Sequence, residues 1–216
     1  QLKWIKSNLE KKFYLIIFFI ISLVLSFFIT KNMNTNFLIN TILIGSAFYL
    51  FFITLRDFFL KKFENFHQNI SHFGFSLLIL SILLNNIFSN EIITNLKVGE
   101  SFKNSKYEII FNKLKQEKQN NYISLKGNFT IITNEKITDN LEPELRIYNQ
   151  PNIITSEADI KTSLYADKFI TMNTVNNEEY LNIRYQEKPF MIWVWISVLL
   201  IASGGFISLT KKRYAK

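Results

Sequence analysis

The run FYLIIFFIISLVLSFFI, from Phe13 to Ile29, contains no charged residue and lies between Lys12 and Lys31. At 1.5 Å per residue, a helix of this length nearly crosses the hydrocarbon core of a bilayer, which is about 30 Å thick. The residues that follow it lack the small side chains of a signal-peptide cleavage site. The run therefore predicts a membrane-spanning helix that stays in the protein.

Three further apolar stretches predict spans at about 37–55, 70–88 and 190–209. The high hydrophobic content, 48% of 216 residues, agrees with a chain that faces lipid over much of its length. We therefore expect an α-helical membrane protein with four transmembrane helices and a small β-rich extramembrane domain between helices three and four. The expected divisions are 1–89 for three helices, 90–188 for the domain, and 189–216 for helix four and a basic tail.

The distribution of charge predicts the orientation. Residues 90–188 carry 13 Lys and Arg against 14 Asp and Glu, whereas the rest of the chain has a net charge of +9. The excess lies before helix one, after helix two and after helix four, and the positive-inside rule places those segments on the inner side of the membrane. The domain then faces the periplasm or the intermembrane space. Because the excess charge lies beside the membrane, it does not indicate nucleic-acid binding.

Between Asn90 and Lys188 the pattern has mostly a period of two, as in Tyr107, Ile109 and Phe111, which indicates strands. Further strands are expected at 122–133, 145–148, 169–172 and 180–185. We expect turns at Gly99, 120–121, 139–140 and 176–177, and one short helix at 157–164.

The extramembrane domain lacks the groups of a complete active site. It has no histidine, and its single carboxylates are typical of a solvated surface. The chain has no cysteine at all, which excludes disulfides, thiolate metal sites, thiol nucleophiles and covalent haem attachment to this chain. We therefore expect no catalytic residue in this chain.

Only His67 and His72 can act as neutral imidazole ligands, and in a helix they would project about 140° apart. His67 lies in a polar segment and is expected to be an interfacial side chain. His72 begins an apolar run, where an imidazole requires a partner and is a candidate functional group. Either His72 holds haem iron, with Gly74 leaving room for a flat porphyrin and another chain providing a second ligand, or it hydrogen-bonds a neighbouring helix or headgroup.

The order and spacing of several motifs resemble the C-terminal part of CcmF, the membrane haem lyase component of system I cytochrome c maturation. The matching motifs are His72-Phe-Gly-Phe, Val98-Gly99-Glu100-Ser101 with Tyr107, Asn121-Tyr122, Thr155 to Ile160, Lys188-Pro189-Phe190, Trp193, Trp195, Gly204-Gly205 and Lys212-Arg213-Tyr214. The resemblance implies that His72 is an axial ligand of a haem b shared with another chain. It also implies partners: an N-terminal CcmF-type chain carrying the WWD segment, which has no match here, other cytochrome c maturation proteins, and apocytochrome c.

Two functional hypotheses follow. In one, the chain is a subunit of a cytochrome c haem lyase that assists haem handling and attachment to apocytochrome c. In the other, it is a non-catalytic scaffold subunit of a larger inner-membrane, for example respiratory, complex that retains this fold. Ile, Lys, Asn and Phe make up 99 of the 216 residues, a bias of AT-rich genomes. We therefore expect a mitochondrial inner membrane location, with a bacterial inner membrane as the alternative.

Overall fold

The computed structural model describes residues 2–31, 36–60, 66–133, 136–175 and 179–214. The chain divides into two compact units: residues 1–87 together with 190–216, and residues 88–189. The first unit contains the helices α1 (Leu2–Thr30), α2 (Phe37–Leu60), α3 (Phe66–Phe88) and α4 (Met191–Tyr214). All four are long and apolar enough to span a membrane, which confirms the predicted class of helical membrane protein.

Small and hydroxyl-bearing side chains connect neighbouring helices. Ser26 on α1 donates its Oγ–H to the carbonyl oxygen of Thr41 on α2 at 2.9 Å, and the hydroxyls of Thr30 and Thr41 lie 2.7 Å apart. Between α2 and α3, the hydroxyls of Thr54 and Ser76 lie 2.5 Å apart. Lipid offers these groups no hydrogen-bond partner, so neighbouring helices satisfy them.

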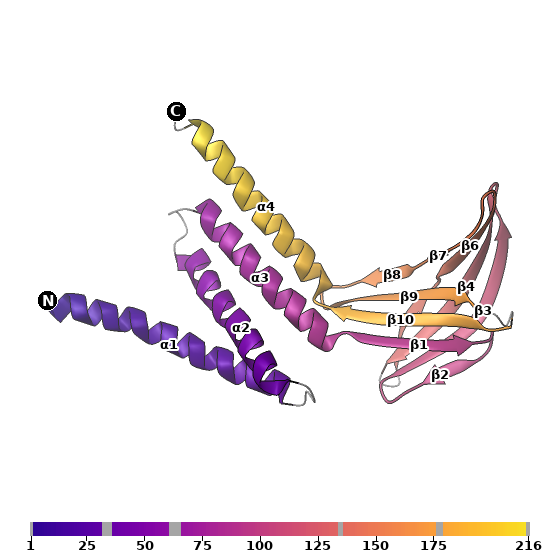
Figure 1. Ribbon diagram of the computed structural model, residues 1–216, viewed down its shortest axis with the longest axis horizontal. Helices are drawn as coiled ribbons and strands as arrows, with labels where there is room; N and C mark the ends of the chain where they lie inside the picture. Colours follow the sequence, from indigo (N-terminus) through magenta and orange to yellow (C-terminus); the bar gives the residue numbers. More distant parts are fainter. Residues whose placement is uncertain (1, 32–35, 61–65, 134–135, 176–178, 215–216) are drawn as a thin grey trace. The chain divides into compact units, whose positions relative to one another are not determined.

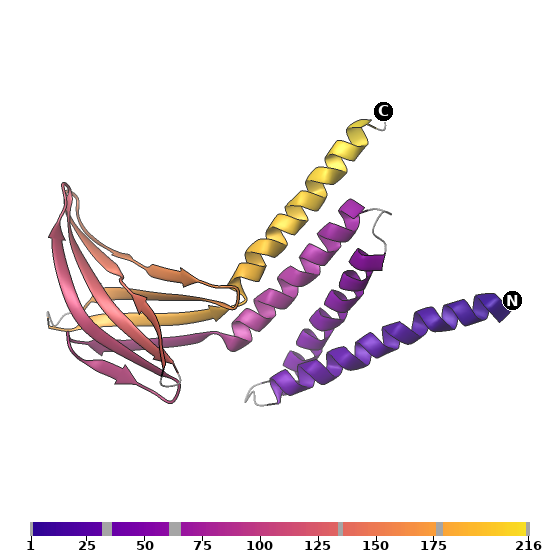
Figure 2. The same ribbon diagram turned by 180° about the vertical axis from the view of Figure 1, so that it is seen from behind.

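The second unit is an antiparallel β-sandwich (Figure 1; Figure 2 shows it from behind). One sheet has the order β1-β10-β9-β8, and the other has the order β2-β3-β4-β6-β7, with β5 also paired to β4. The strand bounds are β1 Asn90–Leu96, β2 Ser101–Lys103, β3 Tyr107–Lys118, β4 Tyr122–Thr133, β5 Lys136–Leu141, β6 Glu144–Asn149, β7 Asn152–Glu157, β8 Asp159–Thr162, β9 Ala166–Thr174 and β10 Leu181–Pro189.

The core of the sandwich follows the predicted alternation. Tyr107, Ile109 and Phe111 of β3 are buried, whereas Glu108 and Ile110 between them are only partly buried. Phe111 stacks on Phe129 of β4, with ring centroids 4.4 Å apart. Because alternate residues of a strand point to opposite faces, one face of each sheet builds this core.

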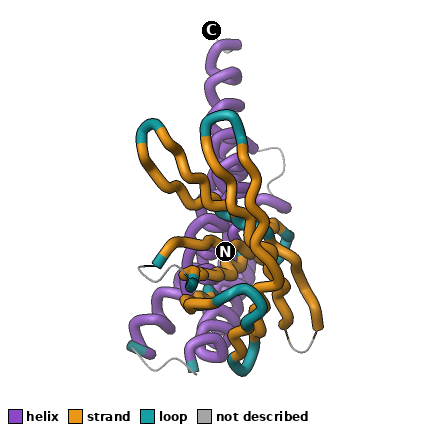
Figure 3. The backbone as a smooth tube through the Cα atoms, turned by 90° about the vertical axis from the view of Figure 1, so that its right-hand side faces the viewer, coloured by secondary structure: helices purple, strands orange, loops and turns teal. Residues whose placement is uncertain are grey.

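Two sequence expectations for the domain are wrong. The segment 157–164, expected to be a helix, forms the end of β7, strand β8 and the turn after it; Figure 3 shows the described part of the domain as strands and turns. Asp139, expected in a turn, lies inside β5. Gly99 does form a turn, with φ of +90°, while the expected turn at 176–177 lies outside the described residues.

Candidate functional site

His72 lies on the exposed side of α3. It is in the second turn of that helix, and its side chain is exposed within this chain. Residues three or four apart share a helix face, and the same face carries the exposed Gln68, Phe75 and Ile82. The imidazole therefore projects from a largely apolar stripe that no described helix of this chain covers.

The described residues provide no iron ligand opposite His72. No described side chain is hydrogen-bonded to its ring, and the chain has only one other histidine, His67. His67 is partly buried in the first turn of α3. Five residues separate the two histidines, so they project in different directions and cannot ligate one iron together.

Gly74 does not create space beside His72, contrary to the sequence expectation. It is buried against α4: a Cβ added there would lie 2.9 Å from the Ser197 carbonyl oxygen and 2.9 Å from the Cβ of Leu200. Successive residues of an α-helix are rotated by about 100°, so Gly74 and His72 project about 160° apart. The glycine allows close packing of α3 on α4 and leaves His72 on the opposite side.

The two helices also pack closely at Gly204 of α4. A Cβ at this position would lie 2.6 Å from the carbonyl oxygen of His67 and 2.2 Å from Oγ of Ser71. The adjacent Gly205 has no atom within 4 Å of its added Cβ. Gly204 therefore acts as a packing glycine, while Trp193 and Trp195 at the start of α4 remain exposed to 38% and 58%.

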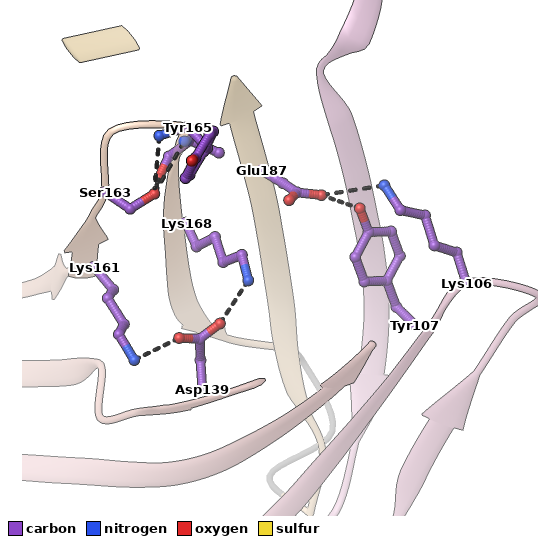
Figure 4. Close-up of polar contacts among 9 residues, drawn as sticks. Lys106, Tyr107, Asp139, Lys161, Ser163, Tyr165, Lys168 and Glu187 are labelled. Carbon is purple, nitrogen blue, oxygen red and sulfur yellow. Dashed lines mark hydrogen bonds and ion pairs between the residues drawn. The ribbon is translucent and has the colours of Figure 1, made fainter. Parts of the chain in front are cut away.

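An ion-pair cluster around the buried carboxylate of Asp139 joins the two sheets of the domain. Asp139 on β5 accepts from Lys161 on β8 at 2.6 Å and from Lys168 on β9 at 2.7 Å (Figure 4). Burial tends to raise the pKa of Asp139, but the two ammonium groups outweigh burial and lower it below its ordinary value. Asp139 is only 6% exposed, so it is not the solvated carboxylate that the sequence suggested.

A second polar cluster lies where β3 begins. The hydroxyl of Tyr107 donates to the Glu187 carboxylate on β10, and the Lys106 ammonium lies 3.3 Å from the same carboxylate (Figure 4). Burial, together with Glu187, raises the pKa of Tyr107 well above its ordinary range. A phenol that stays protonated acts as a hydrogen-bond donor, so this cluster is structural.

The described residues contain no group of three or more His, Asp or Glu side chains that could hold a metal ion. Sequence reasoning missed both polar clusters, because each joins residues that are distant in the sequence. The candidate site of this chain is thus the exposed α3 face around His72.

The domain and most of the chain are similar to known proteins. Residues 87–189 match the family described as the CcmF C-terminal beta-sandwich. This segment belongs to that family. The cytochrome c-type biogenesis protein CcmF of Haemophilus influenzae is 28% identical over 145 residues, which cover 67% of this chain. CcmF of Pseudomonas aeruginosa is 25% identical over 147 residues.

A solved structure titled "Cytochrome c Heme Lyase CcmF" matches 88% of this chain and 33% of its own, with a TM-score of 0.64 and 14% identity, which shows a shared fold. The chain is thus related to the C-terminal part of CcmF, and the match spans about a fifth, 22%, of the length of each of the two bacterial CcmF relatives. Four apolar helices and these bacterial relatives identify a multi-pass inner-membrane protein.

Proposed function

We propose that this chain acts in cytochrome c maturation as the C-terminal part of a haem lyase, and that His72 is an axial ligand of a haem b held within the membrane. The names of the relatives support the general role. The single observation that carries the haem proposal is the exposed imidazole of His72 on an apolar helix face, with no ligand opposite it among the described residues.

The donor set fits haem. A neutral imidazole is a common axial ligand of haem iron, and exposed apolar side chains such as Phe75 and Ile82 on the same face can contact a porphyrin ring. Bound there, haem b would supply one-electron chemistry for reducing the iron of a second haem before its attachment to apocytochrome c.

His72 provides one ligand, and we propose that a partner provides the second. We propose that this partner is an N-terminal CcmF-type chain that carries the WWD segment, and that one of its helices packs on the α3 face around His72. The β-sandwich would then provide a docking surface for other maturation proteins and for apocytochrome c. The abundance of Ile, Lys, Asn and Phe, which is a bias of AT-rich genomes, favours a location in the mitochondrial inner membrane.

The test is an optical spectrum of the complex purified with the N-terminal chain. His72→Ala removes the iron ligand and provides no donor in its place, so the reduced haem b band should be lost or shifted. His67→Ala is the matched control, a histidine of the same helix on another face, and should leave the band unchanged. A normal haem b band with His72→Ala would overturn the proposal and favour the scaffold hypothesis, with His72 as a packing residue.

A further inference from the structure

The tip of the β8–β9 hairpin exposes two large side chains. Leu164 is 64% exposed and Tyr165 is 85% exposed. The turn that carries them is closely hydrogen-bonded: Oγ of Ser163 accepts from the backbone N–H groups of Tyr165 and Ala166 at 3.3 and 3.1 Å, and donates to the Ala166 carbonyl oxygen at 2.7 Å (Figure 4). The backbone of the tip is thus held by its own hydrogen bonds, while both large side chains are exposed.

Strand register places the base of this tip beside the last residue of β10. Ala166 pairs directly with Pro189, the last residue of β10, and α4 begins two residues later at Met191. Directly opposed residues of antiparallel strands are about 5 Å apart, so Ala166 lies within that distance of the chain that enters the span. This follows from register and covalent connection alone, whatever the angle between the domain and the helices.

The headgroup layer is thick enough to include this tip. A bilayer is about 40–45 Å thick with its headgroups and about 30 Å without them, which leaves about 5–8 Å on each side. The apolar span of α4 starts at Met191, and Trp193 and Trp195 follow it, as expected of an interfacial aromatic belt. Tyr165 is the residue next to Ala166 in the turn.

Hairpins at the opposite end of the domain have different tips. The β3–β4 turn contains Gln119, Asn120 and Asn121, and the β6–β7 turn contains Gln150 and Pro151. Both turns lie at the end of the domain opposite to Tyr107. Tyr107, the first residue of β3, contacts Glu187 near the end of β10. Of these three tips, only the one beside the membrane entry of α4 carries a leucine and a tyrosine.

We infer that Leu164 and Tyr165 form an interfacial anchor, which inserts into the headgroup region of the bilayer and holds this end of the sandwich on the membrane. Tyr165 provides the amphipathic ring that is favoured in this layer, and Leu164 provides apolar contact with the upper acyl chains. The base of the hairpin is fixed by Lys161 and Lys168, which both bind Asp139. The occupant of this surface is therefore lipid.

Because the chain has no cysteine, single-cysteine labelling tests this directly. The variants Leu164→Cys and Tyr165→Cys, each in the full chain, carry a nitroxide spin label in phosphatidylcholine–phosphatidylglycerol vesicles. Asn120→Cys is the control at the polar opposite end, and Leu199→Cys, at the exposed surface of α4, is the lipid reference. Collision rates of the label with oxygen, which partitions into lipid, and with a water-soluble nickel chelate measure its environment.

We expect the ratio of oxygen to nickel collisions at 164 and 165 to be several-fold higher than at 120 and closer to that at 199. A ratio equal to that at 120 would show that the hairpin is in water and would overturn the inference. Labels shielded from both reagents would also overturn it, because they would show that protein covers the tip. Both substituted side chains are exposed, so neither change removes a core contact.

Discussion

The contact between Gly204 and the first turns of α3 makes the replacement Gly204→Ala informative. The added Cβ would lie 2.6 Å from the backbone oxygen of His67 and 3.0 Å from the backbone nitrogen of Ser71. The hydroxyl of Ser71 can rotate away, but these backbone atoms cannot. An ordinary contact of 3.4 Å requires the helices to separate by at least about 0.8 Å, which also weakens the contact at Gly74.

Overpacking of this kind typically costs about 1–3 kcal/mol, and we expect that loss in the free energy of unfolding for Gly204→Ala. Gly205→Ala is the matched control: it makes the same chemical change one residue away, where the added methyl group meets no atom within 4 Å. Both changes gain helix propensity, by up to about 1 kcal/mol, so Gly205→Ala should not destabilise the protein, and the difference between the two variants measures the overpacking. The assay is an SDS titration in mixed micelles, followed by helical circular dichroism. Equal effects of the two changes would refute the packing argument.

Three further predictions concern the domain and its orientation. Asp139→Asn should lower the free energy of unfolding by about 1.5–3 kcal/mol at pH 7, since hydrogen bonds to charged groups are lost. Because the folded-state pKa of Asp139 is lowered, the stability advantage of the wild type is complete above the unfolded pKa of 3.8 and disappears as pH falls through the folded-state pKa. Unfolding of both proteins measured across acid pH tests this dependence. Phe129→Ala removes a fully buried ring from the core and should cost about 3–5 kcal/mol in urea unfolding, and a cost under 1 kcal/mol would contradict the stacked core. Protease added outside right-side-out inner-membrane vesicles should cut within residues 90–188 and leave the C-terminal tail intact, and the reverse pattern would invert the orientation.

The spans and the central strands were predictable because one local constraint determines each. A charge-free run must cross hydrocarbon, and a buried strand such as β3 must alternate its apolar residues. The segment 157–164, which contains the last residue of the edge strand β7 and all of the edge strand β8, was mispredicted as a helix. Their exposed positions lack clear alternation, and only pairing with β6 and β9 defines them.

The site was predictable in part. Composition reduced the candidate ligands to His67 and His72, and the apolar run that follows His72 distinguished it from His67. Its exposure was not predictable, because the sequence does not show which face of α3 packs on α4; the same reason explains the wrong expectation for Gly74. Asp139 resembled a turn residue because its partners, Lys161 and Lys168, come 22 and 29 residues later.

The pairing of β1 with β10 has a consequence for biosynthesis. Asn90 pairs with Glu187 and Leu96 with Leu181, so the first strand of the domain hydrogen-bonds the last. At about 5–20 residues per second, a ribosome needs roughly 5–20 seconds to make the intervening chain. During that interval β1 lacks its partner strand β10. The nascent domain therefore remains incomplete until the segment just before α4 has been made, and completion of the sandwich is timed to synthesis of the last helix.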